Sequence, residues 1–240
     1  MSDRAESLAA AEPVADVRLG SYAGEYVRWE ERLCGLMSTL GVAPRGVVQV
    51  GAHRGQEIPA LAACGFGRMV LVEPNPDLTS ILEDELTAFL GPALSDAAGP
   101  PVWEVVRAAA GRARGRAVLH VTEYDQQSSL FAPVASLAVR RRDITPVVPV
   151  HEVQEGCNVL VADVQGAELE VLHGTDLDRI DLAVVEGSAV PRYRGGATLA
   201  SVADFLRGRG WRQVAEYPHA RPGVSDVAWL APRPRLLPAS

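Results

Sequence analysis

The chain has 240 residues, of which 48% are hydrophobic and 22% are charged, and its formal net charge is −7. A chain of this length and composition can form one sizeable globular core, and its acidic balance excludes a protein that coats nucleic acid. It contains no run of about 18 apolar residues and no basic-then-apolar leader, so we expect a cytoplasmic protein without a membrane partner.

The first residues carry little structural signal. Residues 1–20 are rich in Ala, Glu, Asp and Ser without apolar periodicity, which predicts a mobile leader before a single domain over residues 21–240. The three cysteines, Cys34, Cys64 and Cys157, are widely spaced and odd in number. We expect reduced thiols and no zinc site.

Strands and helices then alternate. Apolar residues step by three and four over residues 22–40, which predicts an amphipathic helix that packs across a sheet. A strand over 46–50, a helix over 56–64 and a strand over 68–72 follow. Glu73 ends that strand at about the 20-residue spacing after the glycine turn at which nucleotide-binding folds place a ribose-binding carboxylate. The alternative role for Glu73 is an ordinary carboxylate at a strand end.

The middle of the chain is less regular. A helix is expected over 77–90, capped by Asp77, and a strand over 103–110. The strand ends in Ala109 and Ala110, whose small side chains suit either close approach of a flat ring such as adenine or tight packing under a turn. Residues 116–124 alternate like one strand of an antiparallel hairpin.

Two polar stretches follow the hairpin. Residues 125–130 form a polar loop that includes Ser128 and Ser129, and residues 140–142 are three arginines. The arginine run is typical of a solvated face, and its functional alternative is a contact with an acidic or phosphorylated acceptor.

The last third contains the most informative unit. A strand over 149–153 precedes an aliphatic strand over 159–162, which stops at Asp163, and Gly166 then turns the chain into a helix. In open α/β sheets, ligands bind beyond the carboxyl ends of the strands, where Asp163, Gln165 and Glu168 would lie.

The chain closes with further alternation. A buried strand over 180–186 ends at Glu186, and a helix over 198–207 follows. Strands over 211–217 and 225–230 are joined so closely that they must be antiparallel.

Four motifs in order resemble the FkbM family of S-adenosylmethionine-dependent methyltransferases: VQVGAHRGQE at 48–57, VEPNP at 72–76, SSL at 128–130 and DVQGAELEVLHG at 163–174. The resemblance runs from about residue 47 to residue 230. It implies an α/β, doubly wound, Rossmann-like class I methyltransferase fold: a mostly parallel seven-stranded sheet closed by an antiparallel strand pair, with helices on both faces.

The resemblance also implies a cofactor, S-adenosyl-L-methionine, with S-adenosyl-L-homocysteine as product, and methylation of a hydroxyl group on a natural product, sugar or related small molecule. The expected cofactor-binding residues are Gly51, Ala52, His53, Gly55, Glu73, Pro74, Ala109, Ala110 and Asp163. Ser128, Ser129 and Gln165 are expected to contact the acceptor.

A hydroxyl needs a base to remove its proton before it attacks a methyl group. Asp163 is the first candidate for this base, with Glu186 and His53 as second choices. A magnesium ion shared by Asp163 and Glu186 is the alternative, but the spacing offers no dedicated ligand cluster, and we expect no metal site.

Two other readings stay open. A nicotinamide-dependent oxidoreductase could use Gly51 and Glu73, although the third glycine of the dinucleotide motif is missing. Gln49 and His53 depart from the family's first motif, which leaves a methyltransferase-like binding protein without catalysis. The expected partner is a small molecule rather than a nucleic acid; a homodimer is compatible with the sequence, which does not fix the oligomeric state.

Overall fold

The structure is a computed structural model that describes residues 28–90, 102–134 and 137–235. The leader expected at 1–20 and the first residues of the helix expected over 22–40 lie outside this part of the chain. The described part of that helix, α1, begins only at Glu30. It ends at Gly41, whose φ of 69° is the left-handed conformation that glycine adopts without steric cost.

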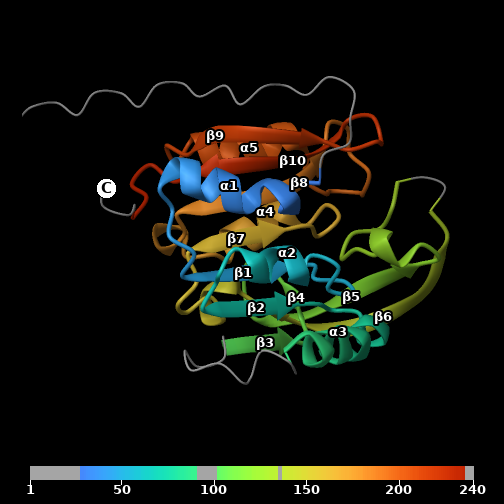
Figure 1. The fold of residues 1–240 in the computed structure, drawn as a ribbon. Helices are drawn as coiled ribbons and strands as arrows, with labels where there is room; N and C mark the ends of the chain where they lie inside the picture. The colour runs from blue at the N-terminus through green and yellow to red at the C-terminus, as the bar shows by residue number, and fades with distance from the viewer. Residues whose placement is uncertain (1–27, 91–101, 135–136, 236–240) are drawn as a thin grey trace, which may run out of the picture.

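The centre of the fold is a seven-stranded sheet with the order β3-β2-β1-β7-β8-β10-β9 (Figure 1). All neighbouring strands are parallel except β10, which runs antiparallel to both β8 and β9. The strands are β1 Gly46–Val50, β2 Arg68–Val72, β3 Val102–Val106, β7 Val159–Ala162, β8 Leu182–Ser188, β9 Arg212–Pro218 and β10 Val224–Leu230.

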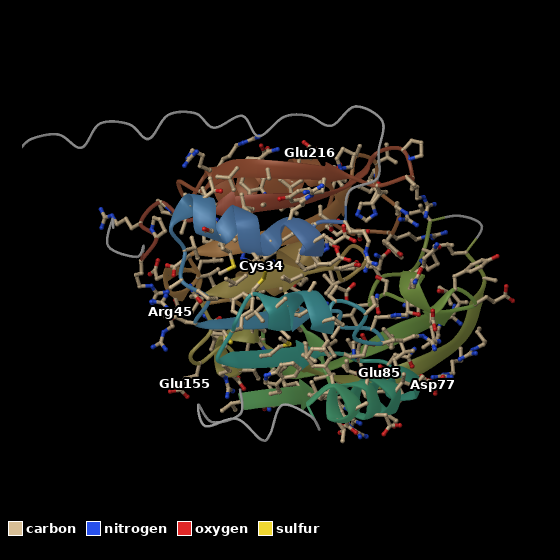
Figure 2. All side chains as sticks on the ribbon, viewed as in Figure 1. Cys34, Arg45, Asp77, Glu85, Glu155 and Glu216 are labelled. Carbon is tan, nitrogen blue, oxygen red and sulfur yellow. A yellow bond between two sulfur atoms is a disulfide. The ribbon has the colours of Figure 1, made fainter. Side chains whose placement is uncertain are left out.

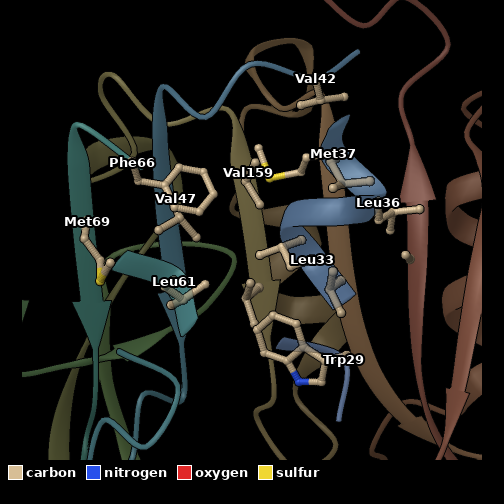
Figure 3. Packing of buried hydrophobic residues seen from close by; sticks show 14 of the residues in the cluster. Trp29, Leu33, Leu36, Met37, Val42, Val47, Leu61, Phe66, Met69 and Val159 are labelled. Carbon is tan, nitrogen blue, oxygen red and sulfur yellow. The ribbon is translucent and has the colours of Figure 1, made fainter. Parts of the chain in front are cut away.

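Helices cover both faces of this sheet, and one apolar cluster lies under each layer. The helices are α1 Glu30–Leu40, α2 Ile58–Ala63, α3 Pro76–Leu90, α4 Glu168–His173 and α5 Leu199–Arg207. Side chains of α1, α2 and α3 pack with one face of the central strands, as Leu33 and Leu61 do against Val47 and Val159 (Figure 3). Side chains of α4 and α5 pack on the other face. The central strands are therefore buried on both sides, as their continuous aliphatic sequences predict.

A second, three-stranded sheet with the order β4-β6-β5 extends from the carboxyl edge of the large sheet. Its strands are β4 Ala109–Ala110, β5 Gly115–Thr122 and β6 Val139–Val148. The single strand expected over 103–110 is wrong, because β3 ends at Val106 and β4 pairs in the other sheet. The arginine run belongs to β6, the hairpin partner of β5.

Two other expectations need correction. Residues 149–153 are not a strand: Val150–Glu152 is a 3-10 helix that leads out of β6. Neither Cys34 nor Cys64 is a reduced thiol, because a disulfide joins them. It links α1 to the end of α2 (Figure 2). Cys157 is a free, buried cysteine.

The α/β fold with a mostly parallel seven-stranded sheet, an antiparallel closing pair and helices on both faces is confirmed. No helix within the described ranges is long and apolar enough to span a bilayer.

Candidate active site

Four polar or turn positions come together because four parallel strands end in register. Val50 at the end of β1 pairs with Val72 of β2 and with Ala162 of β7. Ala162 in turn pairs with Val185 of β8. The residues that come next, Gly51, Glu73, Asp163 and Glu186, therefore line one edge of the sheet, where they border a crevice of about 540 Å³. This volume is within the range of small-molecule sites.

The turn after β1 depends on Gly51. Its φ is +82°, and a Cβ there would lie 1.8 Å from the backbone oxygen of Asp163, so only glycine fits. The N–H groups of Gly51 and Ala52 both donate to the carbonyl of Val72. Ala52 is fully buried, and neither it nor Gly55 lines the crevice. Of these three expected cofactor residues, Gly51 alone forms part of the wall.

Glu73 is held rigidly at the end of β2. One carboxylate oxygen accepts the backbone N–H of His53 at 2.9 Å and the other accepts that of Asn75 at 2.8 Å. Burial raises the pKa of Glu73, and these two backbone hydrogen bonds oppose that rise. Each oxygen keeps one lone pair, so the carboxylate can still accept hydrogen bonds from the crevice. Pro74 lies beside it in the same wall.

Asp163 and Glu186 share one hydrogen-bond donor. The Gln165 amide nitrogen donates to Asp163 Oδ1 at 2.6 Å and to Glu186 Oε2 at 2.7 Å. Its oxygen accepts from the Tyr193 hydroxyl at 2.8 Å, which fixes the orientation of the amide. The structure therefore brings together the two residues expected as bases and places Gln165 as the bridge between them.

Glu186 is the most perturbed of these carboxyl groups. It is 9% exposed, and burial, followed by repulsion from Asp163, raises its pKa well above the ordinary value. A carboxyl group with a raised pKa in a crevice is typical of acid–base sites.

The sequence analysis missed a histidine–carboxylate pair next to Glu186. His219 follows β9, and its Nε2 lies 2.6 Å from Asp226 Oδ2 of β10. Its Nδ1 lies 3.8 Å from Glu186 Oε1. The hydrogen bond with Asp226 raises the pKa of His219. The only signal in the sequence was a histidine at the end of one strand and an aspartate within the next.

Glu57 was missed as well. It lines the crevice and accepts a hydrogen bond from the Gln49 amide at 3.1 Å. Burial raises the pKa of Glu57 to about 7. Gln49, one of the two departures from the family motif, thus positions a further carboxyl group at the crevice.

His53, the other departure, lies in the turn after β1 and lines the crevice. Its φ is 52°, its Nε2 is 3.2 Å from Asp125 Oδ1 without hydrogen-bond geometry, and Asp125 is also paired with Arg54 at 2.6 Å. Arg54 and His53 lower the pKa of Asp125. This contact connects the turn after β1 to the 3-10 helix Asp125–Gln127, and His53 lines the same crevice as Asp163 and Glu186.

Ser128, Ser129, Ala109 and Ala110 all line the crevice. The hydroxyl of Ser129 donates to the backbone oxygen of Gln165 at 2.7 Å and accepts from Phe131 N, so it holds the polar loop against the Gln165 turn. The Ser128 hydroxyl accepts from the backbone of Thr122 at 3.3 Å. Both serines therefore support the loop as well as facing the crevice.

The part of the chain that the structure describes contains no candidate metal site. No group of three or more His, Cys, Asp or Glu side chains there could hold a metal ion.

Comparison with known proteins gives one family match. The sequence model of the methyltransferase FkbM domain matches residues 49–212, more than half of the chain. A search of curated proteins found no significant match.

Several solved structures share the fold. A methyltransferase FkbM from Methylobacillus flagellatus KT has a TM-score of 0.54 at 16% identity, over 79% of this chain and 44% of that one. An rRNA methylase from Streptococcus thermophilus has a TM-score of 0.49 at 11% identity, over 88% of this chain and 100% of that one. A magnesium protoporphyrin IX methyltransferase from Synechocystis PCC 6803, with bound SAM, has a TM-score of 0.46 at 10% identity, over 85% and 78% of the two chains.

At these identities the likeness concerns the fold alone. The chain spans less than half the length of the Methylobacillus protein.

Proposed function

Because the chain belongs to the FkbM methyltransferase family, we propose that it transfers the methyl group of S-adenosyl-L-methionine to a hydroxyl group of a small molecule, such as a natural product or a sugar. The observation that carries this proposal is the pair of carboxyl groups, Asp163 and Glu186, that Gln165 bridges at the floor of the crevice.

The crevice fits the cofactor chemically. Glu73 offers carboxylate lone pairs to a ribose diol, and Ala109 and Ala110 leave room for a flat ring. Gly51 lets the backbone of the turn approach a ligand closely. When bound there, S-adenosylmethionine would supply an electrophilic methyl group on a positively charged sulfur.

The protein's part in the reaction is orientation and proton removal. The acceptor hydroxyl would donate a hydrogen bond to Asp163 or Glu186, so that one carboxylate takes the proton as the new oxygen–carbon bond forms. Gln165 holds both carboxyl groups at one place: Glu186 is 9% exposed, whereas the side chain of Asp163 is open to the crevice. His219, whose Nδ1 lies 3.8 Å from Glu186 Oε1, stabilises the ionised form of Glu186 when the imidazole is protonated.

A small-molecule acceptor is part of this proposal. The net charge of −7 and the carboxyl groups along the crevice favour it over a nucleic acid. A gel-shift assay with ribosomal RNA fragments tests this point, and tight binding that weakens steeply with salt would count against it.

Cofactor binding is tested by thermal unfolding with S-adenosylhomocysteine, S-adenosylmethionine and NAD. At about 100 times its Kd, a ligand that binds only the folded chain adds roughly 2.7 kcal/mol to the free energy of unfolding. We expect stabilisation by the two sulfur compounds and its loss in Glu73→Ala. Glu104→Ala, which removes an exposed carboxylate paired with Arg68 on the same sheet, is the control. Stabilisation by NAD alone would instead favour an oxidoreductase.

Catalysis is tested with labelled S-adenosylmethionine and a panel of hydroxylated small molecules. Asp163→Asn and Glu186→Gln should keep S-adenosylhomocysteine binding, and at least one should lose about 10²–10⁴-fold in turnover. Asp204→Asn, on the exposed side of α5, is the matched control. Full turnover in both crevice variants would rule out the carboxyl pair as the base.

A further inference from the structure

Besides Arg28, which precedes α1, two arginines line the crevice on loops at the β8–β10 side of the sheet. Arg192 belongs to the loop between β8 and α5, and Arg221 to the turn between β9 and β10. Within the described ranges, no carboxylate lies within ion-pair distance of either. Arg192 Nη2 is buried and has no hydrogen-bond partner among those residues.

The backbone holds Arg192 in place. Its carbonyl accepts the N–H of Val134 at 3.0 Å, and Tyr193 forms an isolated antiparallel bridge with Pro133. The N–H of Ala189 donates to the carbonyl of Gly223 at 2.7 Å, which joins this loop to the turn that carries Arg221. The two arginines are therefore presented from connected, hydrogen-bonded segments.

A buried guanidinium donor without an acceptor is unfavourable. Arginine stays protonated in proteins, and a charged N–H removed from water without a partner loses its hydration free energy. The Arg192 guanidinium is not part of the proposed ribose site. That site is at Glu73, which follows β2, whereas Arg192 follows β8. Three strand spacings of about 4.8 Å separate those two strands in the sheet.

We infer that Arg192, assisted by Arg221, binds an anionic group of the methyl acceptor, a carboxylate or a phosphate. The inference rests on the proposed function and narrows its acceptor to hydroxyl compounds that carry such a group. The planar guanidinium matches the two oxygens of either anion, and the acceptor hydroxyl would then reach Asp163 or Glu186 in the middle of the crevice.

The nearby carboxyl groups do not prevent anion binding. Burial and Asp163 raise the pKa of Glu186 well above its ordinary value, which favours its neutral form. Asp226 is paired with His219 at 2.6 Å. Arg192 and Arg221 therefore offer an entering anion two guanidinium groups that form no ion pair with a carboxylate among the described residues.

The test measures anion binding to the full chain, with and without saturating S-adenosylhomocysteine. The probes are inorganic phosphate and malonate, titrated at constant ionic strength and followed by calorimetry and thermal unfolding. Wild-type protein should bind at least one of them. The variants are Arg192→Gln, Arg221→Gln and, as a matched control, Arg194→Gln, which replaces an exposed arginine of the same loop outside the crevice.

Arg192→Gln should weaken probe binding at least about tenfold, since a hydrogen bond to a charged group contributes that much or more. Arg221→Gln should weaken it severalfold, and Arg194→Gln should leave it unchanged. Because Arg221 is exposed, its variant remains informative if Arg192→Gln does not fold. A preference for phosphate would indicate phosphorylated acceptors, and a preference for malonate would indicate carboxylic acids.

Three results would overturn the inference: no binding of either probe, equal binding in Arg192→Gln and wild type, or binding that S-adenosylhomocysteine abolishes. The last would mean that Arg192 pairs with the cofactor's own carboxylate. S-adenosylhomocysteine binding is measured in the same samples, so failure of the anion site is distinguishable from failure of the proposed cofactor site.

Discussion

The hydrogen-bonded pair of Gln49 and Glu57 influences whether the Glu57 carboxyl group is charged in the crevice. Gln49 Nε2 donates to Glu57 Oε2, while Gln49 Oε1 is buried without a hydrogen-bond partner among the described residues. A protonated carboxyl, or an amide, at position 57 could donate to that oxygen. The raised pKa of Glu57, about 7, is consistent with a carboxyl that this setting prefers in its neutral form.

Glu57→Gln should remove a pH dependence of stability. The folded pKa of about 7 exceeds the ordinary value of 4.5, so the folded chain binds this proton more tightly than the unfolded chain. Stability from Glu57 is thus complete below about pH 4.5 and declines as the pH rises to about 7. At pH 8 the variant should be more stable than wild type by roughly 1–3 kcal/mol, and at pH 4 the two should be alike.

Chemical denaturation at several pH values measures this difference. Asp204→Asn is the control, because its exposed side chain on α5 should leave the pH dependence of the wild type intact. If the free energies of unfolding of Glu57→Gln and wild type changed equally with pH, ionisation of Glu57 would not destabilise the fold and the prediction would be wrong.

The His219–Asp226 pair makes a second prediction at the level of single residues. The hydrogen bond that His219 donates to the Asp226 carboxylate raises the pKa of His219, so Asp226→Asn should lower that pKa. NMR titration of the histidine Cε1 protons measures it. The signal of His173, which packs against Phe205 on α5, serves as the control and should not move. An unchanged His219 titration would mean that Asp226 does not stabilise the imidazolium.

The positions of residues at the crevice were predictable where a strand ends and obscure elsewhere. Glu73, Asp163 and Glu186 were identified because an acid at the end of an aliphatic run has one simple location, the carboxyl edge of a parallel sheet. Glu57, His219 and Arg192 carry no such local mark. Their place in the crevice depends on turns and loops that only long-range contacts fix.

At the level of elements, the disulfide joins the helix before β1 to the helix after it. Cys34 lies in α1, Cys64 follows α2, and 30 residues separate them in sequence. Trp29 and Glu30, at the start of α1, line the crevice. The cross-link therefore restrains a helix that contributes to the wall of the site.

Cys34→Ser should lower the free energy of unfolding by about 3–4 kcal/mol, the value expected for a closed loop of this length. Thermal unfolding with and without dithiothreitol measures the effect. The reductant should destabilise wild type and Cys157→Ser but not Cys34→Ser. A reductant that leaves the melting temperature of wild type unchanged would show that the bond does not contribute to stability in solution.

The wrong prediction at 103–110 concerns β4, whose strand partner β6 lies much later in the chain. β6 pairs with β5 on one side and with the short β4 on the other, and its exposed side carries Arg140 and Arg142. Asp77 of α3 forms ion pairs with Arg140 and Arg141, which tie that helix to the second sheet (Figure 2). A run of charged residues is typical of a solvated face. Its pairing within a strand depends on contacts with other parts of the chain.

At the scale of the whole molecule, the first and last family motifs meet at one backbone contact. A Cβ on Gly51 would lie 1.8 Å from Asp163 O, although more than a hundred residues separate the two in sequence. The spacing of β1 and β7 at the crevice therefore depends on a missing side chain.

Gly51→Ala should abolish S-adenosylhomocysteine binding and lower the melting temperature strongly, because the backbone on one side must shift. Gly65→Ala is the matched control: Gly65 also has a positive φ, of +79°, but no atom lies within 4 Å of its added Cβ. That variant should lose only about 1–2 kcal/mol of stability and keep ligand binding. Thermal unfolding with and without the ligand compares the two, and equal behaviour would mean that the Gly51 contact is not limiting.

Aliphatic periodicity and short motifs are local properties of the chain, so the order of the main strands and helices, the family and the three carboxylates at strand ends could be predicted from the amino-acid sequence. The bridge from Gln165 to Asp163 and Glu186, the bond between Cys34 and Cys64 and the position of Arg192 at the crevice could not, because they depend on the tertiary structure. These features arise where distant segments pack together. Their energies depend on burial and on distances between atoms, neither of which the order of residues states directly.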